Sequence, residues 1–281
     1  PPPPPPPPAT TEPSTETKSS AASDVYKRQN LQCAKILEDA LLYDTAGDAA
    51  VFVTESLQGT AGNIPAPDGY FQEIKKILDR HHILFFVDEI FTALGNTGKK
   101  FCFEHYGLVP DMTTISKTLA GGLPISALLT NDEIAQAFAE PEPVQYYTTF
   151  GSNPLMAAAA LACIETIMKE KPWDRAAELG QYWMNGLRKL QRKYAIIGDV
   201  RGKGVMIGVE LVKDRKTKEP AKEESVKLKK EAGKRGLILP AGQGWFGNTI
   251  RMVPSVVMTK DQIDQALHIM DESFEAISKK V

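Results

Sequence analysis

Charged residues follow three apolar segments that have the length of buried strands. Glu55 ends the first segment, Asp88 and Glu89 end the second, and Lys117 follows the third. In open parallel sheets, ligands bind at the carboxyl ends of the strands, where such side chains meet. Carboxylates and a lysine amine at one edge can bind charged ligands and transfer protons. A set of solvated strand ends is the alternative, and this pattern alone does not choose between the two.

The segments that must position these residues alternate between strand and helix patterns. Short apolar runs, such as residues 83–87, are separated by segments with helical apolar spacing, such as residues 70–81. This rhythm predicts an α/β fold with a mostly parallel sheet. We expect strands at residues 49–54, 83–87, 112–116 and 125–130, a Gly/Pro-rich loop at 59–69, and helices at 31–47, 70–81, 132–139 and 153–169.

After about residue 165 the pattern changes to an α+β arrangement. Thr259 and Gln262 have the spacing of a capping box, which predicts the start of a last helix. We also expect helices at residues 175–194 and 223–235, and strands at 196–199, 205–212, 237–239 and 249–253. We therefore assign residues 30–165 to a large α/β domain and residues 166–281 to a smaller C-terminal α+β domain.

The composition argues against several classes of protein. The 281 residues are 42% hydrophobic and 24% charged, and the net charge of -2 gives no reason to expect nucleic acid or an anionic membrane as partner. No apolar run is long enough to span a bilayer. The scattered Cys33, Cys102 and Cys163 favour reduced thiols and a cytoplasmic location over a disulfide framework or a zinc site.

The first 29 residues need a separate interpretation. They open with eight prolines and continue with Ser, Thr and Ala, a composition that predicts a disordered or polyproline-like segment. The hexapeptide at residues 24–29 resembles a translated sequencing adapter. We therefore treat residues 1–29 as non-native, with a genuine low-complexity tail as the alternative.

Several motifs follow one another in a fixed order along the chain. The strongest are Val87-Asp88-Glu89-Ile90 and Ile115-Ser116-Lys117-Thr118, the latter followed by two glycines. Others lie at residues 55–59, 95–111, 149–154, 200–204 and 250–254. Together these motifs resemble those of class III aminotransferases, which bind pyridoxal phosphate and have fold type I. The resemblance covers residues 31–281 and implies transamination, from an amino acid or ω-amine to a 2-oxo acid such as pyruvate or glyoxylate.

The resemblance also implies roles for five residues. Lys117 matches the lysine that forms a Schiff base with the cofactor and then moves a proton. Asp88 matches the carboxylate that keeps the pyridine nitrogen protonated. Ile90 matches an apolar residue on one face of the ring, and Thr149 matches a threonine that reaches the cofactor phosphate of the other subunit in a homodimer. Arg251 matches an arginine that binds the substrate carboxylate.

Three positions depart from the family pattern. Phe91 stands where a glutamine commonly bonds the phenolic oxygen of the cofactor, and Asn96 stands where arginine is common. Thr60 replaces a glutamate that pairs with the equivalent of Arg251. An arginine without that partner favours substrates with a single carboxylate, such as alanine, glyoxylate or β-alanine.

The family's glycine/serine-rich phosphate-binding turn and its ring-stacking aromatic residue do not occur in residues 31–281. We therefore expect an N-terminally truncated chain with weak cofactor binding and little turnover. Two other interpretations of the function stay open. One is a mutase, racemase or decarboxylase with the same cofactor and fold. The other is an inactive fragment or a dimerising scaffold.

Overall fold

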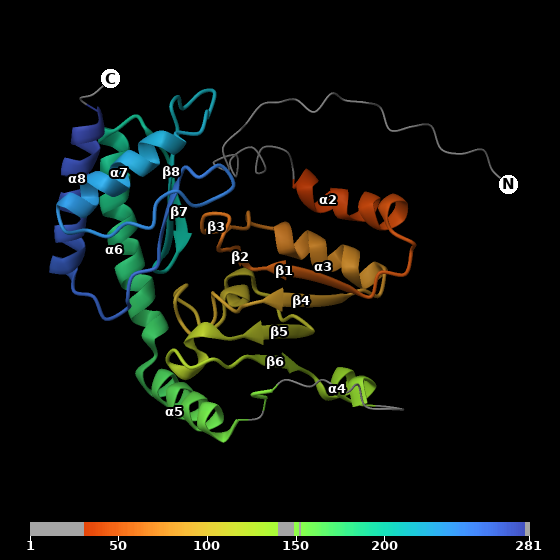
Figure 1. Cartoon of the computed structure of the whole chain (residues 1–281). Coiled ribbons are helices and arrows are strands. Elements are labelled where there is room, and N and C mark those ends of the chain that lie inside the picture. Colours follow the sequence, from red (N-terminus) through yellow and green to blue (C-terminus); the bar gives the residue numbers. More distant parts are fainter. Residues whose placement is uncertain (1–30, 140–148, 152, 279–281) are drawn as a thin grey trace, which may run out of the picture.

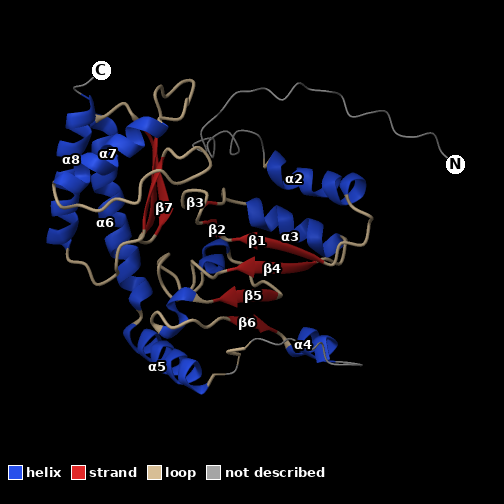
Figure 2. Cartoon of the chain, in the orientation of Figure 1, coloured by secondary structure: helices blue, strands red, loops and turns tan. Residues whose placement is uncertain are grey.

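The computed structural model describes residues 31–139, 149–151 and 153–278. The interpretation of residues 1–29 therefore lies outside the described residues. Within them, the chain forms a four-stranded and a three-stranded sheet, each with helices packed against it, and a small two-stranded sheet (Figures 1 and 2).

The first sheet has four strands in the order β1 (Val51–Glu55), β4 (Leu84–Asp88), β5 (Met112–Ile115) and β6 (Ala127–Thr130). The first two pairs are parallel and the pair β5–β6 is antiparallel. The predicted mostly parallel sheet is thus confirmed. The arrowheads of β1, β4 and β5 point toward the second sheet and helix α6 (Figure 1).

Helix α3 (Tyr70–Arg80) covers one face of this sheet because its apolar residues recur at helical spacing. Phe71, Ile74 and Leu78 are buried in one hydrophobic cluster with Phe85 and Val87 of β4. Helix α2 (Gln32–Asp39) continues into a π-helical turn at Ala40–Asp44 and packs beside α3. This helical layer fixes the sheet from which the charged residues project.

The predicted loop after β1 contains a small hairpin. Strands β2 (Leu57–Gln58) and β3 (Ile64–Pro65) pair antiparallel. Two residues each are too few to give a strand pattern in the sequence, so the hairpin was not predicted. The turn between its two strands contains Gly59 and Asn63.

The second sheet is antiparallel, in the order β7 (Ile197–Lys203), β8 (Met206–Leu211) and β9 (Thr249–Met252). Helices α6 (Pro172–Lys193), α7 (Lys222–Lys234) and α8 (Lys260–Ser278) pack on it around a separate hydrophobic cluster. The predicted capping box of α8 is present, because Thr259 and Gln262 exchange hydrogen bonds between side chain and backbone.

The strand expected at residues 237–239 does not form. Leu239 is buried, but its carbonyl accepts from the backbone N–H of Ala241, and the N–H of Leu237 donates to Ala232. The apolar pattern therefore signalled burial and not strand pairing. The nearby Pro240 carbonyl accepts a hydrogen bond from the backbone of Arg251 on β9.

Helices α4 (Asp132–Ala139) and α5 (Pro154–Glu170) follow β6, and α5 leads into α6. No helix in the described part of the chain is long and apolar enough to cross a membrane. The same residues contain no cluster of His, Cys, Asp or Glu suited to a metal ion, and the three cysteines are free thiols.

Small residues allow the two sheets to approach each other. A Cβ on Gly204, in the turn between β7 and β8, would lie 2.5 Å from the carbonyl oxygen of Asn96, in the loop after β4. The backbone N–H of Val205 in that turn donates 2.9 Å to the carbonyl of Asn96. Asn96 thus joins the loop after β4 to the second sheet through its backbone.

Candidate active site

Asp88 lies at the carboxyl end of β4, directly across from Thr114 of β5. Its Oδ1 accepts a 2.8 Å hydrogen bond from the backbone N–H of Ile90 and a 3.4 Å one from Thr114 Oγ1. No residue in the described ranges donates to Oδ2. The half-buried carboxylate is therefore held through one oxygen, which leaves the other for a ligand.

Lys117 follows β5 on the same edge and opens a 3₁₀ turn at Lys117–Ala120. Its φ of 34° lies in the left-handed region, which a non-glycine residue occupies only when its surroundings hold it there. Ser116 anchors the turn, since its Oγ donates 2.8 Å to the carbonyl of Ile125. The Lys117 side chain is exposed, and no carboxylate of the described residues pairs with it.

Glu89 does not share this edge, which corrects the expectation that it presents a carboxylate beside Asp88. It is fully buried, because successive residues point to opposite faces. It accepts from Ser56 Oγ, Thr92 Oγ1 and the backbone N–H groups of Cys102 and Phe103, at 2.6 to 2.9 Å. Burial raises the pKa of Glu89 above its usual range, while these donors lower it. Glu89 fixes the loop and has no opening to a ligand.

Arg251 reaches the same region from β9 of the second sheet. Its Cζ lies 5.1 Å from the centroid of the Phe91 ring, and Lys117 Nζ lies 5.5 Å from that centroid. Both distances are within the range of a cation–π interaction. The half-buried Arg251 has no carboxylate partner among the described residues, and Thr60 is exposed. The structure therefore brings Lys117 and Arg251 together around Phe91.

Glu55, at the end of β1, supports the wall of this site. Its Oε2 accepts a 2.8 Å hydrogen bond from the backbone N–H of Gly59. A Cβ on Gly59 would lie only 2.6 Å from Cδ1 of Phe91. Glu55 thus holds the glycine backbone against the aromatic ring, a role that its position after a strand did not indicate.

Ile90 and Thr149 differ in how the structure places them. Ile90 directly follows the strand end, is half-buried and belongs to none of the three hydrophobic clusters. Its side chain is thus not committed to the core. Thr149 is exposed in a turn that precedes α5, where a second molecule can contact it.

Sequence reasoning missed Thr114, Gly59 and Phe91 as parts of this site. Thr114 lies on the same face as Asp88 in the neighbouring strand. Thr114 could therefore have been predicted as a site residue only if the register of the two strands had been known. Phe91 was noted only as a lost hydrogen-bonding position. Its contact with Arg251 joins residues that are far apart in the chain, and no local pattern predicts such a contact.

Comparison with known proteins gives the same family that the motifs suggest. The family model described as Aminotransferase class-III matches residues 6–274, a range that reaches into the proline-rich segment set aside above. The leucine/methionine racemase of Thermococcus litoralis is 43% identical over 83% of this chain and 51% of its own. The alanine–glyoxylate aminotransferase 2 homolog 2, mitochondrial, of Arabidopsis thaliana is 38% identical over 85% of this chain and 50% of its own.

The fold matches that of solved transaminases. An amine transaminase from an uncultivated Pseudomonas species, in its pyridoxal-phosphate-bound form, superposes with a TM-score of 0.81 and 28% identity. The match covers 89% of this chain and 57% of that one. The expected fold type I architecture is thereby confirmed. The chain spans about half the length of the curated relatives it matches. From the family match and these identities, the chain belongs to the class III aminotransferases.

Proposed function

We propose that this chain carries the reactive half of a pyridoxal-phosphate-dependent aminotransferase site. The reaction moves an amino group from an amino acid or ω-amine to a 2-oxo acid such as pyruvate or glyoxylate. The observation that carries the proposal is the approach of Lys117 and Arg251 to one aromatic ring, next to the sheet edge where Asp88 lies. Asp88 ends β4, Lys117 follows the neighbouring parallel strand β5, and Phe91 contacts both Lys117 and Arg251.

The residues present fit the cofactor. The Asp88 carboxylate, bonded through Oδ1, has Oδ2 available for a protonated pyridine nitrogen. The Lys117 amine is exposed for bonding to an aldehyde, and Ile90 is available for an apolar contact with a ring. When bound, pyridoxal phosphate supplies a sink for the electron pair left at the substrate Cα.

Each side chain then has a distinct task. Lys117 would hold the cofactor through its amine, and the same amine would move the proton at the substrate Cα. Asp88 keeps the ring nitrogen protonated by placing a negative charge beside it. Arg251 binds the substrate carboxylate, because a planar guanidinium can donate two parallel hydrogen bonds. A single unpaired arginine is suited to substrates with one carboxylate.

We also propose a homodimer in which Thr149 reaches the cofactor phosphate of the partner subunit. Helix α5 supports this, because Leu155, Leu161 and Met168 are exposed along it. The helix contacts the 3₁₀ turn of Lys117, and Cys163 Sγ lies 3.2 Å from the carbonyl of Thr118. A partner that covers α5 would therefore lie next to the Lys117 site.

Two further proposals concern organisation and location. One hydrophobic cluster takes all its members from residues 176–277, which supports a division near residue 165 into a large and a small domain; Met206 of β8 packs in the cluster beneath α3 and joins the two. The three free thiols support a reducing compartment such as the cytoplasm.

Racemisation is the second candidate function. It is favoured by the 43% identity to a leucine/methionine racemase. The same lysine chemistry serves both reactions, because each begins by moving the proton at the substrate Cα. Incubation of L-leucine without an oxo acid separates them: a racemase forms D-leucine without an acceptor, whereas a transaminase accumulates product only when the acceptor is added.

Lys117 can be tested directly by chemical trapping. The purified chain is incubated with excess pyridoxal phosphate, reduced with borohydride and digested, and the modified lysine is identified by mass spectrometry. We expect the label at Lys117 well above that at exposed lysines such as Lys76 and Lys234. Lys117→Arg should lose this label and keep the background labels. Equal labelling of all exposed lysines would contradict the proposal.

A further inference from the structure

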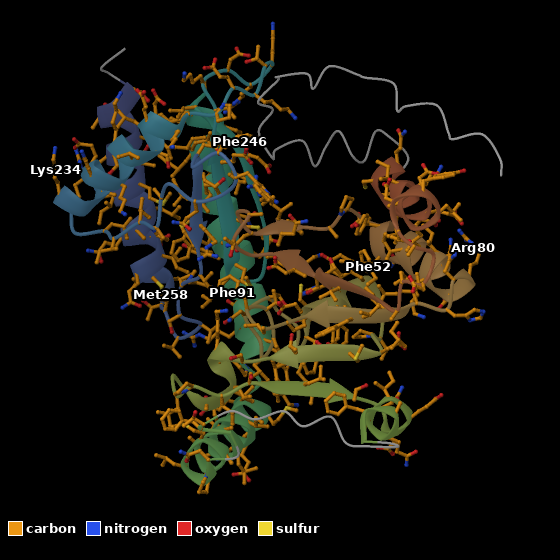
Figure 3. All side chains as sticks on the ribbon, turned by 45° about the vertical axis from the view of Figure 1, so that its right-hand side comes forward. Phe52, Arg80, Phe91, Lys234, Phe246 and Met258 are labelled. Carbon is orange, nitrogen blue, oxygen red and sulfur yellow. The ribbon has the colours of Figure 1, made fainter. Side chains whose placement is uncertain are left out.

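The ring of Phe91 lies beside both cations of the proposed site. Lys117 Nζ and Arg251 Cζ are 5.5 Å and 5.1 Å from the ring centroid, although they come from different sheets. Figure 3 places Phe91 where the strand ends of the first sheet meet the second domain. A molecule that reaches from Arg251 to Lys117 therefore passes along this ring.

The position of the ring is built into the fold. A Cβ on residue 59 would come within 2.6 Å of the Phe91 ring, so only glycine allows the hairpin backbone to approach this closely. The Glu55 carboxylate holds that backbone in place through the N–H of Gly59. The half-buried ring also packs on the cluster beneath α3. The Gly59 backbone and the cluster beneath α3 thus hold the Phe91 ring in a fixed position.

The chemistry of this surface distinguishes between substrates. The face of an aromatic ring carries partial negative charge, which attracts the two cations and repels an anion. A carboxylate in the side chain of a substrate would lose water against this ring, and the ring offers it no hydrogen-bond donor. An aliphatic side chain would instead bury apolar area against it.

We propose that Phe91 is a specificity-determining residue, which selects amino acids with one carboxylate and an aliphatic side chain against those whose side chain carries a second carboxylate. This inference rests on the proposed function, since it takes Arg251 as the carboxylate-binding group. It differs from the argument from Thr60, which concerns only whether Arg251 is free. Here the ring itself acts on the part of the substrate beyond the α-carboxylate.

The test measures binding to the purified chain without cofactor, by ligand-detected NMR titration. The probes are 4-methylpentanoate, with one carboxylate and an aliphatic chain, and glutarate, with two carboxylates. We expect the unsubstituted chain to bind 4-methylpentanoate roughly tenfold more tightly. Phe91→Gln should remove the preference, and Phe91→Leu should keep most of it because leucine remains apolar. Arg251→Ala should weaken both probes.

A second variant covers the case in which Phe91→Gln does not fold, which circular dichroism would reveal. In Gly59→Ala the added Cβ displaces the Phe91 ring, so this variant should also reduce the preference for 4-methylpentanoate over glutarate. Equal binding of the two probes to the unsubstituted chain, including binding of neither, would overturn the proposal. So would a preference that survives in Phe91→Gln, or probe binding that does not depend on Arg251.

The failure of this inference can be told apart from the failure of the proposed function. Labelling of Lys117 together with equal probe binding would leave the aminotransferase site standing and remove the role of Phe91. A preference that depends on Phe91 without labelling of Lys117 would show a selective carboxylate site in a chain that lacks the proposed lysine chemistry.

Discussion

The side-chain amide of Asn63 donates a 3.2 Å hydrogen bond to the carbonyl of Met252, the residue that follows Arg251 on β9. The same amide nitrogen donates 3.0 Å to the carbonyl of Ile207 on β8. Asn63 is fully buried and belongs to the hairpin that carries Gly59. One asparagine thus ties the wall of the candidate site to the strand that holds its arginine.

Replacing Asn63 with glycine should loosen this connection. Asn63 has a φ of 53°, which glycine adopts without strain, so Asn63→Gly mainly removes the two hydrogen bonds. We expect a loss of about 1–3 kcal/mol in the free energy of unfolding, because two buried carbonyls lose a donor. We also expect weaker binding of 4-methylpentanoate.

Chemical denaturation and the NMR titration measure the two effects separately. Gln181→Ala is the control, because the Gln181 amide makes an exposed hydrogen bond to Asn185 within α6. If Asn63→Gly and Gln181→Ala lowered stability equally, Asn63 would not hold the two parts together.

The elements were predictable where a local pattern sets them. The continuous apolar run at residues 83–87 gave β4, and the spacing of Thr259 and Gln262 gave the start of α8. The charged ends of β4 and β5 then placed Asp88 and Lys117 on one edge, because parallel neighbouring strands end together. These inferences need only chain-local information and the rule for parallel sheets.

The rest of the site depends on contacts that no local pattern encodes. Asp88 and Glu89 are adjacent and both acidic, yet only Glu89 is sealed by the loop that carries Cys102. Period-two alternation predicts that they face opposite ways, but not which face the later loop covers. The contact of Phe91 with Arg251 likewise requires the packing of two sheets. Such a contact depends on how the two sheets pack, and the spacing of residues along the sequence does not determine that packing.

Substitution of Glu89 by glutamine should be strongly destabilising. Each carboxylate oxygen accepts one hydroxyl and one backbone N–H. A glutamine NH₂ at either end would therefore face an N–H donor, from Cys102 or from Phe103. We expect Glu89→Gln to lose about 2–4 kcal/mol of unfolding free energy, the range for a broken buried charged network.

Urea denaturation measures the loss, with Glu73→Gln as the matched control. Glu73 forms an exposed pair with Lys76 on α3, and exposed pairs contribute little. A Glu89→Gln chain as stable as the Glu73→Gln chain would contradict the structural role assigned to Glu89.

The exposed face of α5 predicts association between two copies of the chain. Within α5, Ala160 is the one buried residue, whereas Leu155 and Leu161 are 64% and 59% exposed. Glutamate at both leucines would place charge in an apolar interface, where it cannot be solvated. We expect the unsubstituted chain to have the mass of a dimer and the double variant that of a monomer.

Sedimentation velocity distinguishes the two masses. Val226→Glu is the control, because Val226 is an exposed apolar residue on α7 and not on α5. A monomeric unsubstituted chain, or a dimer that tolerates both glutamates, would count against an α5 interface.

His105 predicts how stability depends on pH. Its Nε2–H donates 2.9 Å to the carbonyl of Thr97. Burial, followed by the nearby charges of Lys203 and Lys99, lowers the pKa of His105 to about 4 from an ordinary value of 6.5. Between these two values the unfolded chain binds a proton that the folded chain excludes. Stability therefore falls as pH decreases from about 6.5 toward 4, and this contribution is constant above that range.

The difference between the unsubstituted chain and His105→Gln isolates this effect from the titration of carboxylates. Because His105 is only half-buried, solvent screening reduces the expected extra loss between pH 7 and pH 5 to about 1 kcal/mol. Urea denaturation at the two pH values measures it. His82→Gln is the control for the loss of an imidazole at an exposed position. If His105→Gln lost as much stability on acidification as the unsubstituted chain, protonation of His105 would not be linked to unfolding.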